Sequence, residues 1–69
     1  MSEIDWERQY NIAVDFLKDR HSVGTPDLQR HLQMGYTGSA RIMDMLEQRS
    51  IVGPYIKGGY PRKVLAIHD

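Results

Sequence analysis

Four polar residues recur at helical spacing in the middle of the chain, within the segment TGSARIMDMLEQ. Thr37, Arg41, Asp44 and Gln48 are separated by four, three and four positions, which places them within about 40° on one face of an α-helix. Their side chains suit the base edges of a DNA major groove, and a carboxylate there accepts a hydrogen bond from cytosine N4. A solvated helix surface gives the same pattern, and periodicity alone favours that plainer interpretation.

A second group of basic residues lies near the end of the chain. Lys57, Arg62 and Lys63 surround a Gly-Gly pair, with two tyrosines close by. Cations at the tip of a hairpin contact phosphates or enter a minor groove. Arg30, ahead of the polar stripe, is a further candidate for the DNA backbone. The alternative is a charged hairpin that only faces solvent.

The residues needed for catalysis or metal binding are not arranged to act together. His21, His31 and His68 have no metal-ligand spacing, and the chain has no cysteine. No serine occupies a nucleophile elbow, and Asp44 with Glu47 reads as a surface pair on one helix rather than an acid–base pair. We therefore expect no catalytic site, metal, cofactor or small-molecule substrate.

The length of the chain and its charge distribution bound the number of domains and the location of the basic candidates. The chain has 69 residues, which predicts one domain over residues 1–69, near the lower limit for a single core. It has no apolar run that would span a membrane and no signal-peptide pattern, and the lack of cysteine suits the cytoplasm. Net charge is zero, but residues 1–27 carry three Lys/Arg against six Asp/Glu and residues 28–69 carry six against three. Both basic candidates lie in the second part.

Capping residues predict two helices in the first half. The first helix is expected from Trp6 to Arg20, with Asp5 as its N-cap. The second is expected over residues 26–33, with Thr25 as its N-cap and proline at its first position. Each boundary therefore has its own cap or breaker.

The third helix is the one that carries the polar stripe. Gly35 is expected to end the preceding helix in a left-handed conformation, and Thr37 to cap a helix that runs to about Arg49. Its opposite face should pack in the core, and the residues on that face are Ser39, Ile42, Met43 and Leu46.

The end of the chain reads as a hairpin. Two β-like runs, residues 50–56 and 62–68, are joined by KGGYP, and Val23 suits a short strand. Three helices with a tight turn and a terminal hairpin make a mainly α fold with a small β-hairpin, the winged helix-turn-helix. In that fold the third helix lies in the major groove.

The segment LQRHLQMGYTGSARIMDMLEQRSIVGP, followed by PRKVL, resembles the C-terminal γ domain of the FtsK/SpoIIIE family of bacterial DNA translocases. The resemblance spans about residues 8–67. It implies a winged helix that binds short oriented sequences in double-stranded DNA and guides chromosome segregation at the cytoplasmic nucleoid. It also implies contact with a tyrosine recombinase. The matching residues are Leu28, Gln29, Arg30, Leu32, Gly35, Tyr36, Ala40, Arg41, Ile42, Met43, Leu46, Glu47, Ile51, Val52, Gly53, Pro54, Arg62, Val64 and Leu65.

The departures from the family pattern lie where DNA sequence is read. The family commonly has Asn-Arg after Gly-Tyr, whereas this chain has Thr37 and Gly38. A guanine-reading arginine is thus replaced by a glycine, whose small size lets the helix approach the groove. Asp44 replaces a frequent glutamate, and Ser50 replaces the usual glycine. DNA binding is therefore expected, but not the family's recognition sequence.

No phosphate-binding loop of a motor occurs in the chain. The chain is therefore either an excised domain or a free-standing protein, and its opening, MSEIDWERQY, favours the second. A rival function is protein–protein interaction, because zero net charge weakens the electrostatic case for DNA. The acidic, aromatic first helix would then dock a recombinase or a second copy of the chain. Salt separates the two, since phosphate contacts weaken steeply as salt rises.

Overall fold

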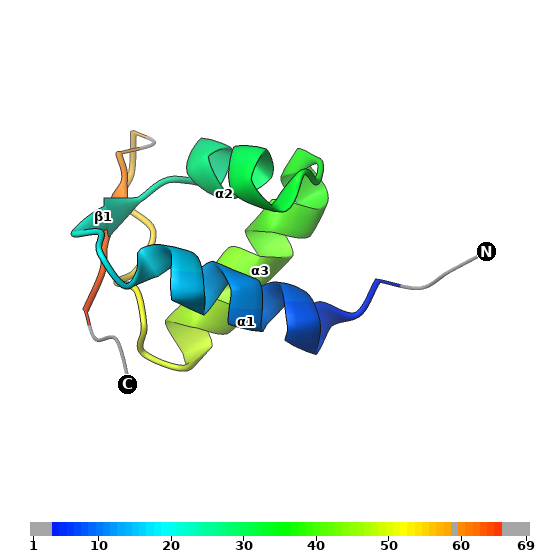
Figure 1. The fold of residues 1–69 in the computed structure, drawn as a ribbon. Coiled ribbons are helices and arrows are strands. Elements are labelled where there is room, and N and C mark those ends of the chain that lie inside the picture. The colour runs from blue at the N-terminus through cyan, green and yellow to red at the C-terminus, as the bar shows by residue number, and fades with distance from the viewer. Residues whose placement is uncertain (1–3, 59, 66–69) are drawn as a thin grey trace.

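Three helices form most of the fold, and each packs against the other two (Figure 1). The computed structural model describes residues 4–58 and 60–65. Its helices are α1 (Trp6–Leu17), α2 (Thr25–Leu32) and α3 (Tyr36–Gln48). The sequence-based prediction of three helices is confirmed. His68 and the end of the second β-like run lie outside the described residues.

Helix α1 begins as predicted and ends early. The Asp5 carboxylate accepts a hydrogen bond from the backbone N–H of Arg8 at 3.0 Å, which confirms it as the N-cap. The helix was expected to reach Arg20 but stops at Leu17, whose carbonyl accepts from the N–H of Arg20 at 3.0 Å in a tight turn. That turn lets Val23 enter the core, where it is fully buried.

The N-cap of α2 is Gly24, and the prediction of Thr25 is wrong by one position. The Asp27 carboxylate reaches back and accepts from the N–H of Gly24 at 2.9 Å. This bond satisfies the backbone N–H of Gly24. The helix therefore starts one residue earlier than predicted. Thr25 is therefore the first residue of α2.

The turn between α2 and α3 also differs from the prediction. Gln33, not Gly35, takes the left-handed conformation, with φ 54° and ψ 45°. Gly35 is extended and serves as the N-cap of α3, since its carbonyl accepts from the N–H of Ser39 at 3.1 Å. Thr37 therefore lies inside α3 and does not cap it. The whole turn is thus only three residues long, from Gln33 to Gly35.

The core lies between the three helices and the short sheet. On α3 it takes the four residues predicted from periodicity: Ser39, Ile42, Met43 and Leu46 are all buried. The side chain of Ser39 contributes no hydrogen bond, because its hydroxyl has no partner among the described residues. The apolar core consists of Tyr10, Ala13, Leu17, Val23, Leu28, Ile42, Met43, Leu46, Ile51 and Val52.

Two short strands form the sheet: β1 (Ser22–Val23) and β2 (Arg62–Lys63). They are antiparallel, with Ser22 opposite Lys63 and Val23 opposite Arg62. On the other side of β2, an isolated bridge joins Val52 to Val64. The two predicted β-like runs therefore meet only at this bridge. The paired strands of the sheet are β2 and β1 instead. A winged helix with three helices and a small antiparallel sheet is the observed fold, as predicted.

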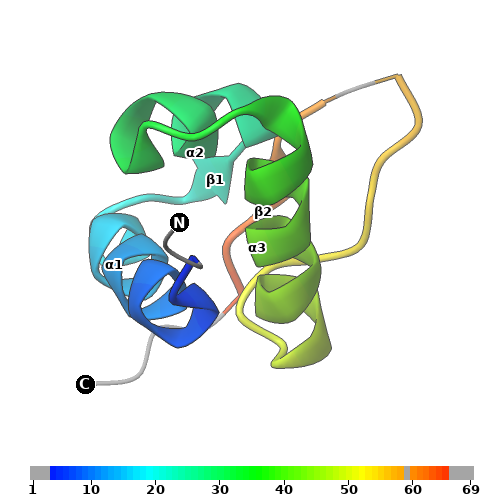
Figure 2. The same cartoon turned by 90° about the vertical axis from the view of Figure 1, so that its right-hand side faces the viewer.

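The chain between the two runs forms a loop beside α3 (Figure 2). We call residues 54–58 and 60–63 the wing. The segment leading into it is fixed by a bond from the N–H of Gly53 to the carbonyl of Lys63 at 2.8 Å. The wing is therefore attached to the core at its base, next to the sheet.

Ser50 has a backbone conformation that favours glycine. It follows α3 with φ 61°, at the position where the family pattern that the sequence resembles has glycine. This left-handed conformation lets the N–H of Ile51 reach the carbonyl of Leu46 at 2.9 Å and close the end of the helix. The serine side chain makes that conformation strained.

We expect Ser50→Gly to raise the free energy of unfolding by about 0.5–1 kcal/mol, because relief of the strain exceeds the extra chain entropy of glycine. The measurement is the midpoint of urea unfolding. The control is Ser22→Gly, in the extended backbone of β1, which should lower stability instead. A loss at both positions would show that the left-handed conformation costs the serine nothing.

Candidate nucleic-acid interface

The polar stripe of α3 is exposed along the whole helix. Helical spacing predicted that four residues would be exposed, and the structure agrees for Thr37, Arg41, Asp44 and Gln48. The 13 residues of α3 make a rod about 20 Å long. A helix of this size fits the major groove of DNA, which is about 12 Å wide. The structure therefore presents four hydrogen-bonding side chains on a surface that a duplex can reach.

Arg41 is positioned by an aromatic ring. Its guanidinium lies over the Trp6 ring of α1, 4.4 Å from the ring centroid. Arg41 forms no ion pair within residues 4–58 and 60–65. Stacking restrains the planar group, while Arg41 itself stays exposed. Its N–H groups can therefore meet a ligand with little loss of freedom.

Gly38 offers backbone rather than a side chain, and Met34 partly covers it. A Cβ placed on Gly38 would lie 3.2 Å from the Met34 sulfur. Any larger residue at this position must therefore push the thioether aside. The methionine is flexible and can move, so substitution is tolerable but changes the packing of the turn.

The three wing cations are not equivalent. Lys57 and Lys63 are exposed, whereas the side chain of Arg62 is only 12% exposed and is paired with Glu47 of α3 at 3.0 Å. The Arg62 guanidinium also lies 5.8 Å from the centroid of the Tyr55 ring. Arg62 thus joins the wing to α3, and the two lysines remain as the exposed charges.

Arg30 is exposed but already engaged. Its guanidinium lies 2.8 Å from the Asp27 carboxylate, which Arg20 also approaches at 3.3 Å. The neighbouring His31 stacks on Phe16 of α1, with ring centroids 4.1 Å apart. These contacts explain His31 as a packing residue between α1 and α2. No group of acids and histidines suited to a metal occurs in the described part of the chain.

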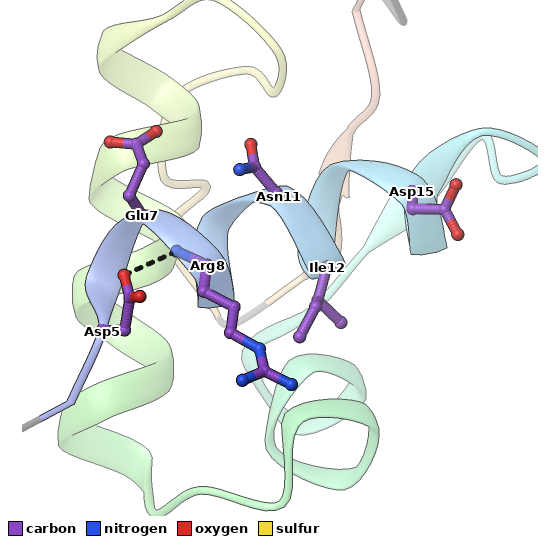
Figure 3. Close-up of a pocket in the computed structure, with 6 residues that line it drawn as sticks. All are labelled: Asp5, Glu7, Arg8, Asn11, Ile12 and Asp15. Carbon is purple, nitrogen blue, oxygen red and sulfur yellow. Dashed lines mark hydrogen bonds between the residues drawn. The ribbon is translucent and has the colours of Figure 1, made fainter.

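The outer side of α1 is acidic. A shallow pocket there has three carboxylates and one arginine in its lining, which consists of Asp5, Glu7, Arg8, Asn11, Ile12 and Asp15 (Figure 3). Glu7 also holds Arg49, at 3.0 and 3.4 Å, and the Arg49 guanidinium lies 4.2 Å from the centroid of the Tyr10 ring. The Glu7 carboxylate, followed by Tyr10, raises the pKa of Arg49 above its usual value, so this arginine stays charged. Carboxylates on α1 would repel DNA, which leaves α3 and the wing as the favourable side.

Two partners of the candidate site were not found from the sequence. Trp6 supports Arg41 and Glu47 holds Arg62. The sequence indicated Trp6 only as the start of a helix and Glu47 only as part of a surface pair. Each contact joins segments far apart in the chain, 35 residues in one case and 15 in the other. Helical spacing reports only neighbours on one helix, so no local pattern signals either pair.

The chain is similar to segments of known DNA translocases. It matches the family described as the FtsK γ domain over residues 5–67. It is 45% identical over 56 residues to DNA translocase FtsK of Halalkalibacterium halodurans and 41% identical over 56 residues to DNA translocase SpoIIIE of Bacillus subtilis, with 81% of this chain covered in both cases. A third relative, DNA translocase FtsK of Lactiplantibacillus plantarum, is 41% identical over 58 residues, or 84% of this chain.

The chain is much shorter than these relatives. The matched segment spans 7% of the length of each of the three. No solved structure matches the chain. Among the helices of the described residues, none has the length and apolar character needed to cross a membrane.

Proposed function

This chain belongs to the family of FtsK γ domains, and from that premise we propose that it binds double-stranded DNA through α3 and the wing. The observation that carries the proposal is an exposed polar stripe on α3, beside a wing that exposes Lys57 and Lys63. A third helix in this fold enters the major groove. The relatives are named as DNA translocases, which supports DNA as the ligand of this domain.

The stripe supplies the contacts to bases. Arg41 donates its fork of N–H groups to guanine, and Thr37 and Gln48 hydrogen-bond to base edges at either end of the helix. Asp44 accepts from cytosine N4, since next to a phosphate it would be repelled. Gly38 lets the start of α3 approach the groove closely.

The phosphate contacts come from three exposed cations. Lys57 and Lys63 meet the backbone from the wing, and Arg30 meets it from α2. The ion pair between Arg30 and Asp27 is exposed, with 74% of the Arg30 side chain accessible, and such pairs contribute about 0–1 kcal/mol. A phosphate can therefore compete for this arginine. Arg62 positions the wing through Glu47 rather than contacting DNA itself.

The same premise gives the process. We infer that the domain directs a translocase, or a protein that works with one, along bacterial DNA during chromosome segregation. A tyrosine recombinase is its proposed protein partner. The acidic pocket on α1 (Figure 3) supports a second candidate function, the docking of a basic protein segment there. Docking of a protein segment on α1 would not involve the exposed lysines of the wing.

A salt series on duplex DNA tests the proposal. The logarithm of the affinity should fall linearly with the logarithm of the salt concentration, by about 0.9 for each phosphate contacted. We expect the double variant Lys57→Ala, Lys63→Ala to bind all duplexes more weakly and to reduce that slope by roughly 2. Fluorescence anisotropy with labelled duplexes measures both quantities.

The matched control removes the same charge from α1. Arg8 on that helix and Lys18 directly after it are both exposed, so Arg8→Ala, Lys18→Ala should leave the slope unchanged. Equal effects of the two double variants would show that only net charge matters and that the wing has no special role. Absence of salt-dependent binding by the parent would reject DNA binding and favour protein docking.

A further inference from the structure

A cleft with three tyrosines opens between α2, α3 and the wing. Its volume is about 260 Å³, and its walls include Thr25, Pro26, Tyr36, Tyr55, Tyr60 and Arg62. These are three of the four tyrosines in the chain. They come from two segments that the fold brings together, the start of α3 and the wing. No local sequence pattern assigned a role to any of them.

The three rings are exposed far beyond what packing requires. Tyr36 and Tyr55 are 65% exposed and Tyr60 is 67% exposed, whereas Tyr10 in the core is 8% exposed. Rings with so little buried surface add little to the stability of the fold. Exposed aromatic residues that gather in one place mark binding surfaces. A tyrosine also combines an apolar ring with a hydroxyl that donates and accepts hydrogen bonds.

Two of the rings are held in place. Tyr55 lies beside the Arg62 guanidinium, which Glu47 fixes at 3.0 Å. Tyr60 packs over Gly58, where an added Cβ would come within 3.1 Å of the ring. The hydroxyls, by contrast, make no hydrogen bond to any other residue of the ranges 4–58 and 60–65. Two of the rings therefore have defined neighbours, and the three hydroxyls are not engaged by any residue that the structure describes.

The lining of the cleft suits a phosphate backbone. It contains no carboxylate among the residues that the structure describes, and the hydroxyls of tyrosine and threonine are common donors to DNA phosphates. Tyr36 directly precedes Thr37 at the start of the polar stripe. The cleft therefore adjoins the start of the surface that is proposed to face DNA.

We propose that the cleft binds the sugar–phosphate backbone of the duplex whose bases face α3, with the hydroxyls of Tyr36, Tyr55 and Tyr60 donating to phosphate oxygens. This proposal rests on the proposed function and extends it to neutral contacts. Uncharged donors release no counterions when they meet a phosphate, so they add affinity without adding salt dependence. That property separates them from the lysines of the wing.

Tyrosine-to-phenylalanine variants test the proposal, because they remove the hydroxyl and keep the ring. We expect Tyr36→Phe, Tyr55→Phe and Tyr60→Phe each to weaken binding by about two- to tenfold. The loss should be the same on different duplex sequences, and the slope of affinity against salt should not change. The matched control is Tyr10→Phe in the core, which should leave DNA affinity unchanged.

A second measurement reports contact directly. Protein labelled with 3-fluorotyrosine gives one ¹⁹F NMR signal for each of the four tyrosines. On addition of duplex DNA, the signals of Tyr36, Tyr55 and Tyr60 should shift, while that of Tyr10 should stay in place. Signals that all stay in place while DNA binds would overturn the proposal.

The outcomes separate this proposal from the one on which it rests. If the parent binds DNA and the phenylalanine variants bind equally well, the cleft does not hold phosphate and the proposal fails alone. If alanine but not phenylalanine weakens binding, the rings contact bases or an apolar peptide instead, which also overturns it. If the parent binds no duplex, both proposals fail together.

Discussion

Leu46→Ala is expected to lower the free energy of unfolding by about 2–5 kcal/mol. Leu46 is fully buried on the face of α3 that packs in the core. Its removal leaves a cavity in a domain of 69 residues, and the whole stability of such small domains lies near the lower end of about 5–15 kcal/mol. The variant should therefore unfold at a much lower urea concentration, with an unchanged slope of the transition.

The control for this prediction is the same substitution at an exposed leucine. Leu65 is 54% exposed, and Leu65→Ala should change stability by no more than about 0.5 kcal/mol. Leu28, which is fully buried on α2, should behave as Leu46 does. A loss below 1 kcal/mol at Leu46 would contradict the packing of α3 described above.

The faces of α3 were predictable because periodicity depends only on local geometry. A repeat of 3.6 residues determines which side chains share a face once a segment is helical. The predicted buried face and the predicted exposed stripe therefore both agree with the structure. The buried residues are Ser39, Ile42, Met43 and Leu46, and the exposed residues are Thr37, Arg41, Asp44 and Gln48. Nothing outside the helix is needed for this part of the prediction.

The ends of the helices were harder to predict because several residues compete for each cap. Gly24, Thr25 and Asp27 all lie near the start of α2, and the bond from Gly24 N–H to the Asp27 carboxylate decides the outcome. At the next turn, Gln33 takes the left-handed conformation although Gly35 would adopt it at lower cost. There the spacing of two packed helices overrides local preference.

The state of the wing cations depends on tertiary contacts and could not be predicted locally. Lys57, Arg62 and Lys63 look alike in the sequence, yet only Arg62 lies within reach of Glu47. The same holds for β2, whose partner β1 is about 40 residues away along the chain. Such pairs depend on the distance that the packed helices set between the segments.

The prediction with the largest effect on function concerns Arg41. We expect Arg41→Lys to abolish the preference for one base pair while leaving affinity for unrelated duplexes almost unchanged. Lysine keeps the positive charge but has no planar fork, so it loses the planar stacking on Trp6 that fixes the donors and the rigid match of a fork to guanine. The discrimination lost should be about 1–3 kcal/mol. Selection from random duplexes first identifies the preferred sequence, and competition at one salt concentration then measures the preference.

Arg49→Lys is the matched control for this experiment. Arg49 also stacks on an aromatic ring of α1 and is exposed, but it follows the last residue of α3 and is paired with Glu7. Its substitution should leave the selected sequence and the preference intact. If Arg41→Lys weakens binding equally on all duplexes, Arg41 contacts the backbone and not a base. If the lysine variant keeps the full preference, the stripe reads sequence without its arginine, and Trp6 then serves the core rather than recognition.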